Sequence, residues 1–166
     1  MPIKDKIPRP IKRVLIALDY EKSATKVASG GYSLAHALGA EVVLLHVIND
    51  PIYYTNTEYS PITGFGGLDP GGFTETLSEK DLKKASNYFL ERIKNHLGDE
   101  GIIDIITEEG DFPDAILKVA ERVKADLLVM GSHSRRGLEK ILIGSVTEKV
   151  LNSSSIPMYI IPVKDI

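Results

Sequence analysis

The chain has 166 residues, of which 43% are hydrophobic and 26% charged, which predicts a single globular domain over residues 1–166. Cysteine is absent, which excludes disulfides, thiolate metal sites and cysteine nucleophiles. A net charge of −3 disfavours general nucleic-acid binding, and no apolar stretch has the length of a membrane span or the form of a secretory leader. We therefore expect a cytoplasmic protein with no nucleic-acid or membrane partner.

Buried strands and amphipathic helices are predicted to alternate along the chain. Short apolar runs are typical of parallel strands buried on both faces, and apolar residues at helical spacing are typical of helices. The predicted elements are a strand at 14–18, a helix from Ser23 to Gly39, a strand at 42–47, a helix from Ser78 to Gly98, a strand at 102–107, a helix from Pro113 to Val123, a strand at 127–130, a helix from Ser145 to Asn152 and a strand at 158–161.

Local features refine the predicted helices. Ser78 with Asp81, and Ser145 with Glu148, have the spacing of a capping box. A glycine pair at 30–31 lies inside the first helix, where glycine is unfavourable, and therefore predicts close packing at that point.

The order of the elements predicts the fold class. Strands that alternate with helices favour right-handed crossovers and an open parallel α/β sheet with helices on both faces. In such sheets ligands bind beyond the carboxyl ends of the strands. Asp19, Val47 and Gly131 stand at or beside three of these ends and are candidate site residues, and His46 is expected to hydrogen-bond locally beside them.

A segment at 49–79 interrupts this pattern. It is rich in glycine and proline, and it contains five acidic residues but no lysine, arginine or histidine. A loop of this length is unusual in a compact domain, so we predict a flexible insertion. The alternative is a lid or a partner-binding arm that uses its interleaved aromatic residues, among them Tyr53, Tyr54 and Tyr59.

Small polar residues join the fourth predicted strand to the last predicted helix. A helix N-terminus offers unpaired N–H groups, and small residues let a phosphate approach the backbone closely. The candidate phosphate contacts are Gly131, Ser132, Ser134, Gly144, Ser145 and Thr147, with Arg135, Arg136 and Lys140 adding positive charge. The alternative is a strand, a surface turn and a helix start without a ligand.

These residues resemble the signature of the universal stress protein family: a glycine, two residues, a glycine, nine residues, a glycine, then serine or threonine. Here Gly131, Ser134, Gly144 and Ser145 occupy the four positions, and Ser134 replaces the second glycine. The resemblance extends from VLIALD at 14–19 through LLHV at 44–47 and ADLLVMGSH at 125–133 to IPMYIIPV at 156–163. It covers nearly the whole chain except the segment at 49–79.

The resemblance implies a Rossmann-like sheet of five parallel strands in the order 3-2-1-4-5, similar to the adenine nucleotide alpha hydrolases, and a homodimer through the strand at 158–161. It implies a site for ATP or another adenine nucleotide, with Mg²⁺ as an accompanying ion. Asp19 and Val47 would flank the adenosine. The ribose and phosphates would be lined by Gly131, Ser134, Gly144, Ser145, Val146 and Thr147.

Two function classes stay open at this point. The first is a nucleotide-binding stress or signalling protein, and the second is a dimeric interaction module of the same fold that needs no nucleotide. The chain lacks the Walker loop and the G-x-S-x-G motif, and it offers no base to activate a water molecule. We therefore expect no enzyme activity beyond slow ATP hydrolysis.

Overall fold

A computed structural model describes residues 9–49, 78–98, 103–132 and 143–163. Every predicted helix and strand is present, with ends that differ from the prediction by a few residues at most. The elements are β1 (Arg13–Leu18), α1 (Ala24–Leu38), β2 (Glu41–Ile48), α3 (Glu79–Leu97), β3 (Ile103–Glu109), α4 (Phe112–Arg122), β4 (Leu127–Gly131), α5 (Ser145–Ser153) and β5 (Met158–Ile161).

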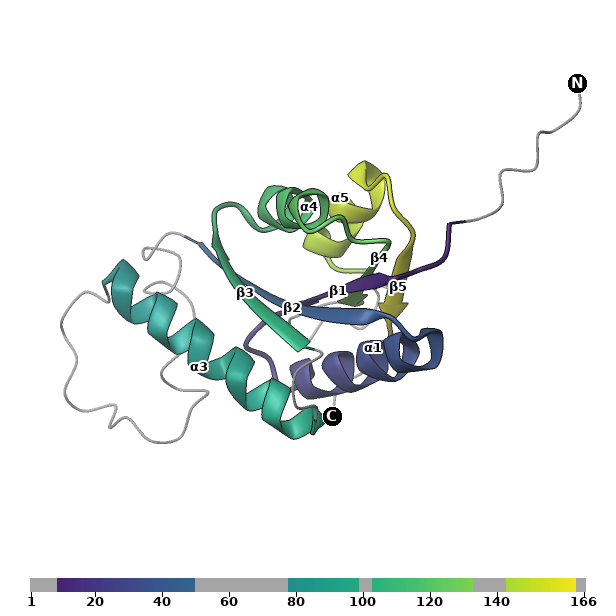
Figure 1. The fold of residues 1–166 in the computed structure, drawn as a ribbon. Coiled ribbons are helices and arrows are strands. Elements are labelled where there is room, and N and C mark those ends of the chain that lie inside the picture. Colours follow the sequence, from purple (N-terminus) through teal and green to yellow (C-terminus); the bar gives the residue numbers. More distant parts are fainter. Residues whose placement is uncertain (1–8, 50–77, 99–102, 133–142, 164–166) are drawn as a thin grey trace, which may run out of the picture.

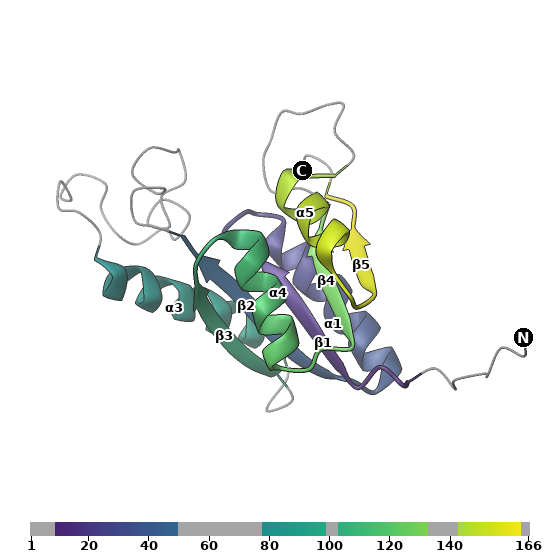
Figure 2. The ribbon, with the colours of Figure 1, turned by 90° about the horizontal axis from the view of Figure 1, so that it is seen from above.

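The strands form one parallel five-stranded sheet in the order β3-β2-β1-β4-β5, which confirms the expected topology. Helices α1 and α3 cover one face of the sheet, and α4 and α5 cover the other (Figure 1). The two helices of the second pair lie side by side (Figure 2). The chain is thus a three-layer α/β structure, as the alternation of elements predicts.

Side chains of each central strand alternate between the two helical layers. In β1, Val14 and Ile16 pack into the core beneath α1 and α3, whereas Leu15 packs into the core beneath α4 and α5. All three are fully buried. Because both faces are covered, the strand has to be apolar at every position, which explains the continuous hydrophobic runs in the sequence.

Two helix boundaries agree with their sequence signals. Ser78 caps α3 in a reciprocal box, in which its hydroxyl accepts from the Asp81 amide and the Asp81 carboxylate accepts from the Ser78 amide. Gly39 ends α1 in the left-handed conformation, at φ 64°. Ser23 occupies the N-cap position of α1, although its side chain makes no capping hydrogen bond.

The glycine pair in α1 sits against the sheet, as its position inside the helix predicts. A Cβ atom on Gly31 would lie 2.7 Å from Ile16 Cδ1 and 3.0 Å from Val129 Cγ1. A Cβ atom on Gly30 would meet Ile161 Cδ1 at 2.7 Å. The helix therefore approaches β1 and β4 more closely than any residue with a side chain would allow at position 31.

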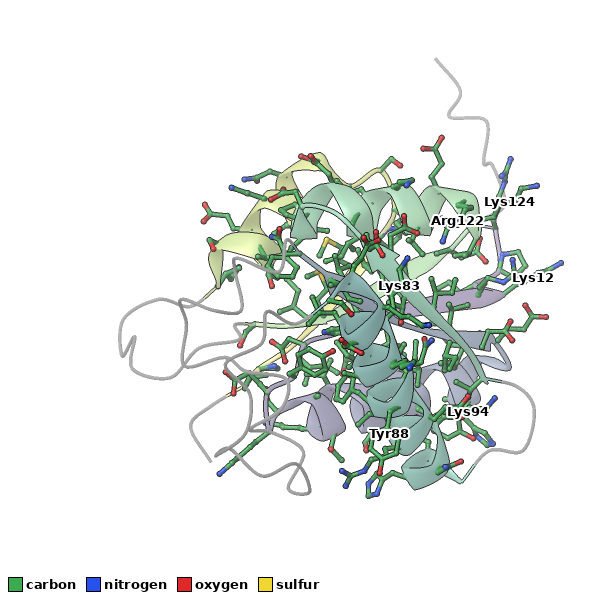
Figure 3. All side chains as sticks on the ribbon, turned by 90° about the vertical axis from the view of Figure 1, so that its left-hand side faces the viewer. Lys12, Lys83, Tyr88, Lys94, Arg122 and Lys124 are labelled. Atoms are coloured by element: carbon green, nitrogen blue, oxygen red, sulfur yellow. The ribbon has the colours of Figure 1, made fainter. Side chains whose placement is uncertain are left out.

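Charged groups line the edge strand β3. Glu108 accepts from Lys118 at 2.8 Å and from Arg122 at 2.7 Å, and Lys83 pairs with Glu109 at 2.6 Å. Figure 3 views the molecule from this side, with Lys83 on α3 and Arg122 on α4. These pairs hold the pKa of both glutamates below its usual value through the hydrogen bonds from the cations.

The predicted insertion at 49–79 lies outside the described residues except at its two ends. Among the helices that the structure describes, none combines the length and the hydropathy that a membrane span requires.

Candidate functional site

Three neighbouring strands bring the candidate residues to one edge of the sheet. In the parallel register Leu18 pairs with His46, and Ile16 pairs with Val129. The residues therefore lie at similar heights along the carboxyl edge: Asp19 directly after β1, Val47 one residue before the end of β2, and Gly131 at the end of β4. This edge, at the centre of an open parallel sheet, is where such folds bind ligands.

Asp19 directly follows β1 and is partly buried. Its Oδ1 accepts a hydrogen bond of 3.1 Å from the Glu21 amide, so the residue also orders the turn that leads into α1. Burial raises the pKa of Asp19 from 3.8 to about 7, with the charge of Glu21 acting in the same direction. At neutral pH the group can therefore either donate or accept a proton in a hydrogen bond.

Val47 contributes to the edge through its main chain. Its side chain is buried in the core beneath α4 and α5. Because that side chain packs inward, only the backbone amide and carbonyl of Val47 remain to contact a ligand.

The hydroxyl groups of Ser132 and Thr147 brace the end of β4. Thr147 donates from Oγ1 to the Gly131 carbonyl at 2.9 Å, and Ser132 Oγ accepts from the Val163 amide at 2.9 Å. The Ser132 amide donates to the Ile161 carbonyl at 2.9 Å. Both residues lie where the sequence places them, and these bonds fix the backbone from which α5 starts.

The start of α5 differs from the predicted capping box. Gly144, in extended conformation at φ −71° and ψ 157°, is the N-cap, and Ser145 is the first residue inside the helix. The Glu148 amide donates to the Gly144 carbonyl at 2.9 Å, within the helix itself. The predicted capping box between Ser145 and Glu148 is wrong, because the N-cap of α5 is Gly144, one residue before Ser145.

This helix start leaves donors for an anion. Gly144 has no side chain with which to cap the first turn, and Ser145 is exposed while Val146 is partly buried. The first backbone N–H groups of a helix lack partners within the helix and carry its positive dipole end. They lie close to the end of β4, because the Thr147 hydroxyl bonds the Gly131 carbonyl.

One predicted phosphate contact, Ser134, lies outside the described residues, as do Arg135, Arg136 and Lys140. Within the described part of the chain, no group of three histidine or acidic side chains is arranged to hold a metal ion.

Sequence reasoning missed a buried polar cluster beside this edge. His46 of β2 bonds Ser86 of α3, which bonds Thr107 of β3, each at 2.7 Å. Tyr20, directly after Asp19, packs its ring on His46 with 4.1 Å between centroids. One sign of this cluster was present in the sequence: Ser86 occupies the apolar face of α3 together with Leu82, four residues earlier.

The sequence as a whole is similar to one known protein family. The sequence matches the profile of the Universal stress protein family over residues 10–162. The chain belongs to the universal stress protein family. Several relatives span most of its length. Universal stress protein MJ0577 of Methanocaldococcus jannaschii is 32% identical over 158 residues, which are 93% of this chain and 96% of MJ0577. Universal stress protein YxiE of Bacillus subtilis is 28% identical over 150 residues, which are 90% of this chain and 97% of YxiE.

Solved structures share the fold of this universal stress protein. The structure of MJ0577 superposes with a TM-score of 0.68 and 26% identity, and the match covers 95% of this chain and 99% of MJ0577. A universal stress protein in complex with cAMP superposes with a TM-score of 0.59 and 19% identity, over 93% of this chain and 98% of that protein.

Proposed function

We propose that this universal stress protein binds an adenine nucleotide at the carboxyl edge of its sheet. The base and ribose would lie beside Asp19 and the main chain of Val47. The phosphates would lie over the start of α5, at Gly144, Ser145, Val146 and Thr147, and beside Gly131, Ser132 and Ser134. The nucleotide would serve as the signal of a stress-response module.

The start of α5 carries this proposal. It places first-turn N–H groups behind a glycine N-cap, beside the end of the central strand β4, and such a helix start favours negative charge. A universal stress protein of the same fold has been solved in complex with cAMP, and this favours a nucleotide over other anions.

Calorimetric titration with ATP, ADP, AMP and cAMP, with and without Mg²⁺, tests the proposal directly. Binding of at least one of the four at micromolar to millimolar concentration is the expected result. If all four fail at millimolar concentration, the alternative holds, in which the chain is a dimeric interaction module that needs no nucleotide.

Replacing Gly144 by valine should abolish nucleotide binding. The extended backbone of Gly144 suits a β-branched residue, so the fold should tolerate the change, but the new side chain would occupy the path of the phosphates. Gly39→Asn is a matched glycine control at the opposite end of the sheet, because asparagine accepts the left-handed conformation there. Equal affinity of Gly144→Val and Gly39→Asn in calorimetry would remove Gly144 from the site.

Binding rather than catalysis is the proposed role, with slow ATP hydrolysis as its upper limit. The described residues that we place in the site include one titratable side chain, Asp19, and its carboxyl is already bonded to the Glu21 amide. A cytoplasmic location, and a protein partner for the segment at 49–79, stay predictions from the sequence.

A homodimer through β5 is the proposed assembly. This edge strand leaves Tyr159 44% exposed, although Ile161 beside it is buried beneath α1. An apolar strand with an open backbone edge favours association with a second copy.

Tyr159→Lys should convert such a dimer to monomer, because a lysine at this position would place a charge in the interface of both copies. Sedimentation velocity over a range of protein concentrations measures the change. Ser33→Ala on the exposed side of α1 is the control. Lys26→Ala would not serve as a control, because Lys26 donates a hydrogen bond to the Pro162 carbonyl next to β5. A monomeric wild-type protein at all concentrations contradicts the assembly.

A further inference from the structure

Four side chains form a hydrogen-bonded row beneath the proposed site. They come from three elements: His46 from β2, Ser86 and Asn87 from α3, and Thr107 from β3. Ser86 is fully buried and His46 is 3% exposed, so neither side chain reaches a ligand in solvent. The row links α3 and the edge strand β3 to the strand that ends beside Asp19.

The donor and the acceptor of each hydrogen bond in the row can be assigned by counting the hydroxyl protons. The Thr107 hydroxyl donates to Asn87 Oδ1 at 2.9 Å. A hydroxyl has one proton to donate, so Thr107 must accept in its 2.7 Å bond with Ser86. Ser86 has then used its own proton and must accept in its 2.7 Å bond with His46 Nδ1.

The imidazole of His46 therefore carries its proton on Nδ1. Burial lowers the pKa of His46 to about 3, so the ring is neutral at pH 7 and holds a single N–H. With that proton on Nδ1, Nε2 keeps its lone pair.

Aromatic ring contacts connect His46 to the residues that follow β1. The His46 ring lies 4.1 Å from the Tyr20 ring and 5.5 Å from the Phe89 ring, and Tyr20 and Phe89 meet edge to face at 5.2 Å. Tyr20 is the residue after Asp19. A rotation of the His46 ring would change its contact with Tyr20, which is joined directly to Asp19 in the turn.

We propose that Ser86 is a positioning residue of the nucleotide site, which holds His46 in its Nδ1–H tautomer and through Tyr20 fixes the turn that carries Asp19. The positioning role rests on the proposed function, whereas the tautomer does not.

The first experiment measures the tautomer by ¹⁵N NMR of the full chain at pH 7, with histidine labelled and the His46 signals assigned by their loss in His46→Gln. Protonated Nδ1 is expected in the wild type and in Thr107→Ser, which keeps the acceptor. Thr107→Val removes the acceptor, so Ser86 should donate to Nδ1 and the proton should move to Nε2. An Nε2–H tautomer in the wild type, or an Nδ1–H tautomer retained in Thr107→Val, would overturn the proposal.

The second experiment compares ATP affinity by calorimetry. Ser86→Ala leaves His46 without its acceptor and should weaken ATP binding about tenfold. Ser33→Ala on α1 is the matched control and should bind like the wild type. Thr107→Val provides a second variant, which should also weaken binding, in case Ser86→Ala does not fold.

The outcomes separate the two ideas. Equal ATP affinity of the wild type and Ser86→Ala would overturn the positioning role and leave the proposed function intact. If the wild type binds no nucleotide, the proposed function fails and the positioning role falls with it, while the NMR result decides the tautomer on its own.

Discussion

Asp19→Asn should make the protein less stable as the pH falls, whereas the stability of the wild-type protein should hardly change. In the variant, the free energy of unfolding should fall by about 3 kcal/mol between pH 6.5 and pH 4, with a slope that rises to about 1.4 kcal/mol for each pH unit below pH 6. In the wild type it should stay nearly constant over the same range.

The cause is that the buried His46 and the partly buried Asp19 respond to pH in opposite directions. Burial lowers the pKa of His46 from 6.5 to about 3, so below pH 6.5 only the unfolded chain gains this proton and acid favours unfolding. Burial raises the pKa of Asp19 from 3.8 to about 7, so between pH 7 and pH 4 only the folded chain holds that proton and acid favours folding. The two effects cancel over the shared range.

Urea denaturation of the nucleotide-free protein at half-unit steps of pH measures both slopes. His46→Gln is the complementary variant. It should become more stable as the pH falls from 7 to 5, because the opposing effect of His46 is removed while the effect of Asp19 remains. An Asp19→Asn profile as flat as that of the wild type would show that Asp19 titrates near its ordinary pKa in the folded protein.

Gly31→Val should destabilise the fold by about 3 kcal/mol or more. The new Cβ would meet Ile16 Cδ1 at 2.7 Å and Val129 Cγ1 at 3.0 Å, both from central strands that are packed on their other sides as well. Neither side chain has room to withdraw, so α1 would have to move away from the sheet.

Gly30→Ala is the matched control for this substitution. Its Cβ would press only on the flexible end of Ile161 in the edge strand β5, and alanine favours the helix by about 1 kcal/mol over glycine. The control should therefore stay within about 0.5 kcal/mol of the wild type in chemical denaturation, with an unchanged denaturant slope. A Gly31→Val protein within about 1 kcal/mol of the wild type would mean that the helix is free to shift.

Patterns within single elements made most of the fold predictable. The buried strands had to be apolar throughout, and Ser78 and Asp81 formed the capping box that their spacing indicates. The order of the strands came from the family resemblance, because hydropathy alone does not say which strands are neighbours.

The site was less predictable for two physical reasons. A glycine N-cap has no side chain, so the start of α5 at Gly144 could not be recognised from capping residues, and Ser145 was assigned to that position instead. His46, Ser86 and Thr107 are far apart in sequence, and only the packing of α3 across β2 and β3 brings them within hydrogen-bonding distance.

The two edges of the sheet also differ in what they offer to another strand. The β3 edge carries Glu108 and Glu109 with their cationic partners, and charged side chains discourage the addition of a further strand. The β5 edge is short and apolar. Pairing of two copies through β5 would therefore leave only the charged edges exposed, so the sheet could not continue to grow from copy to copy into a fibre.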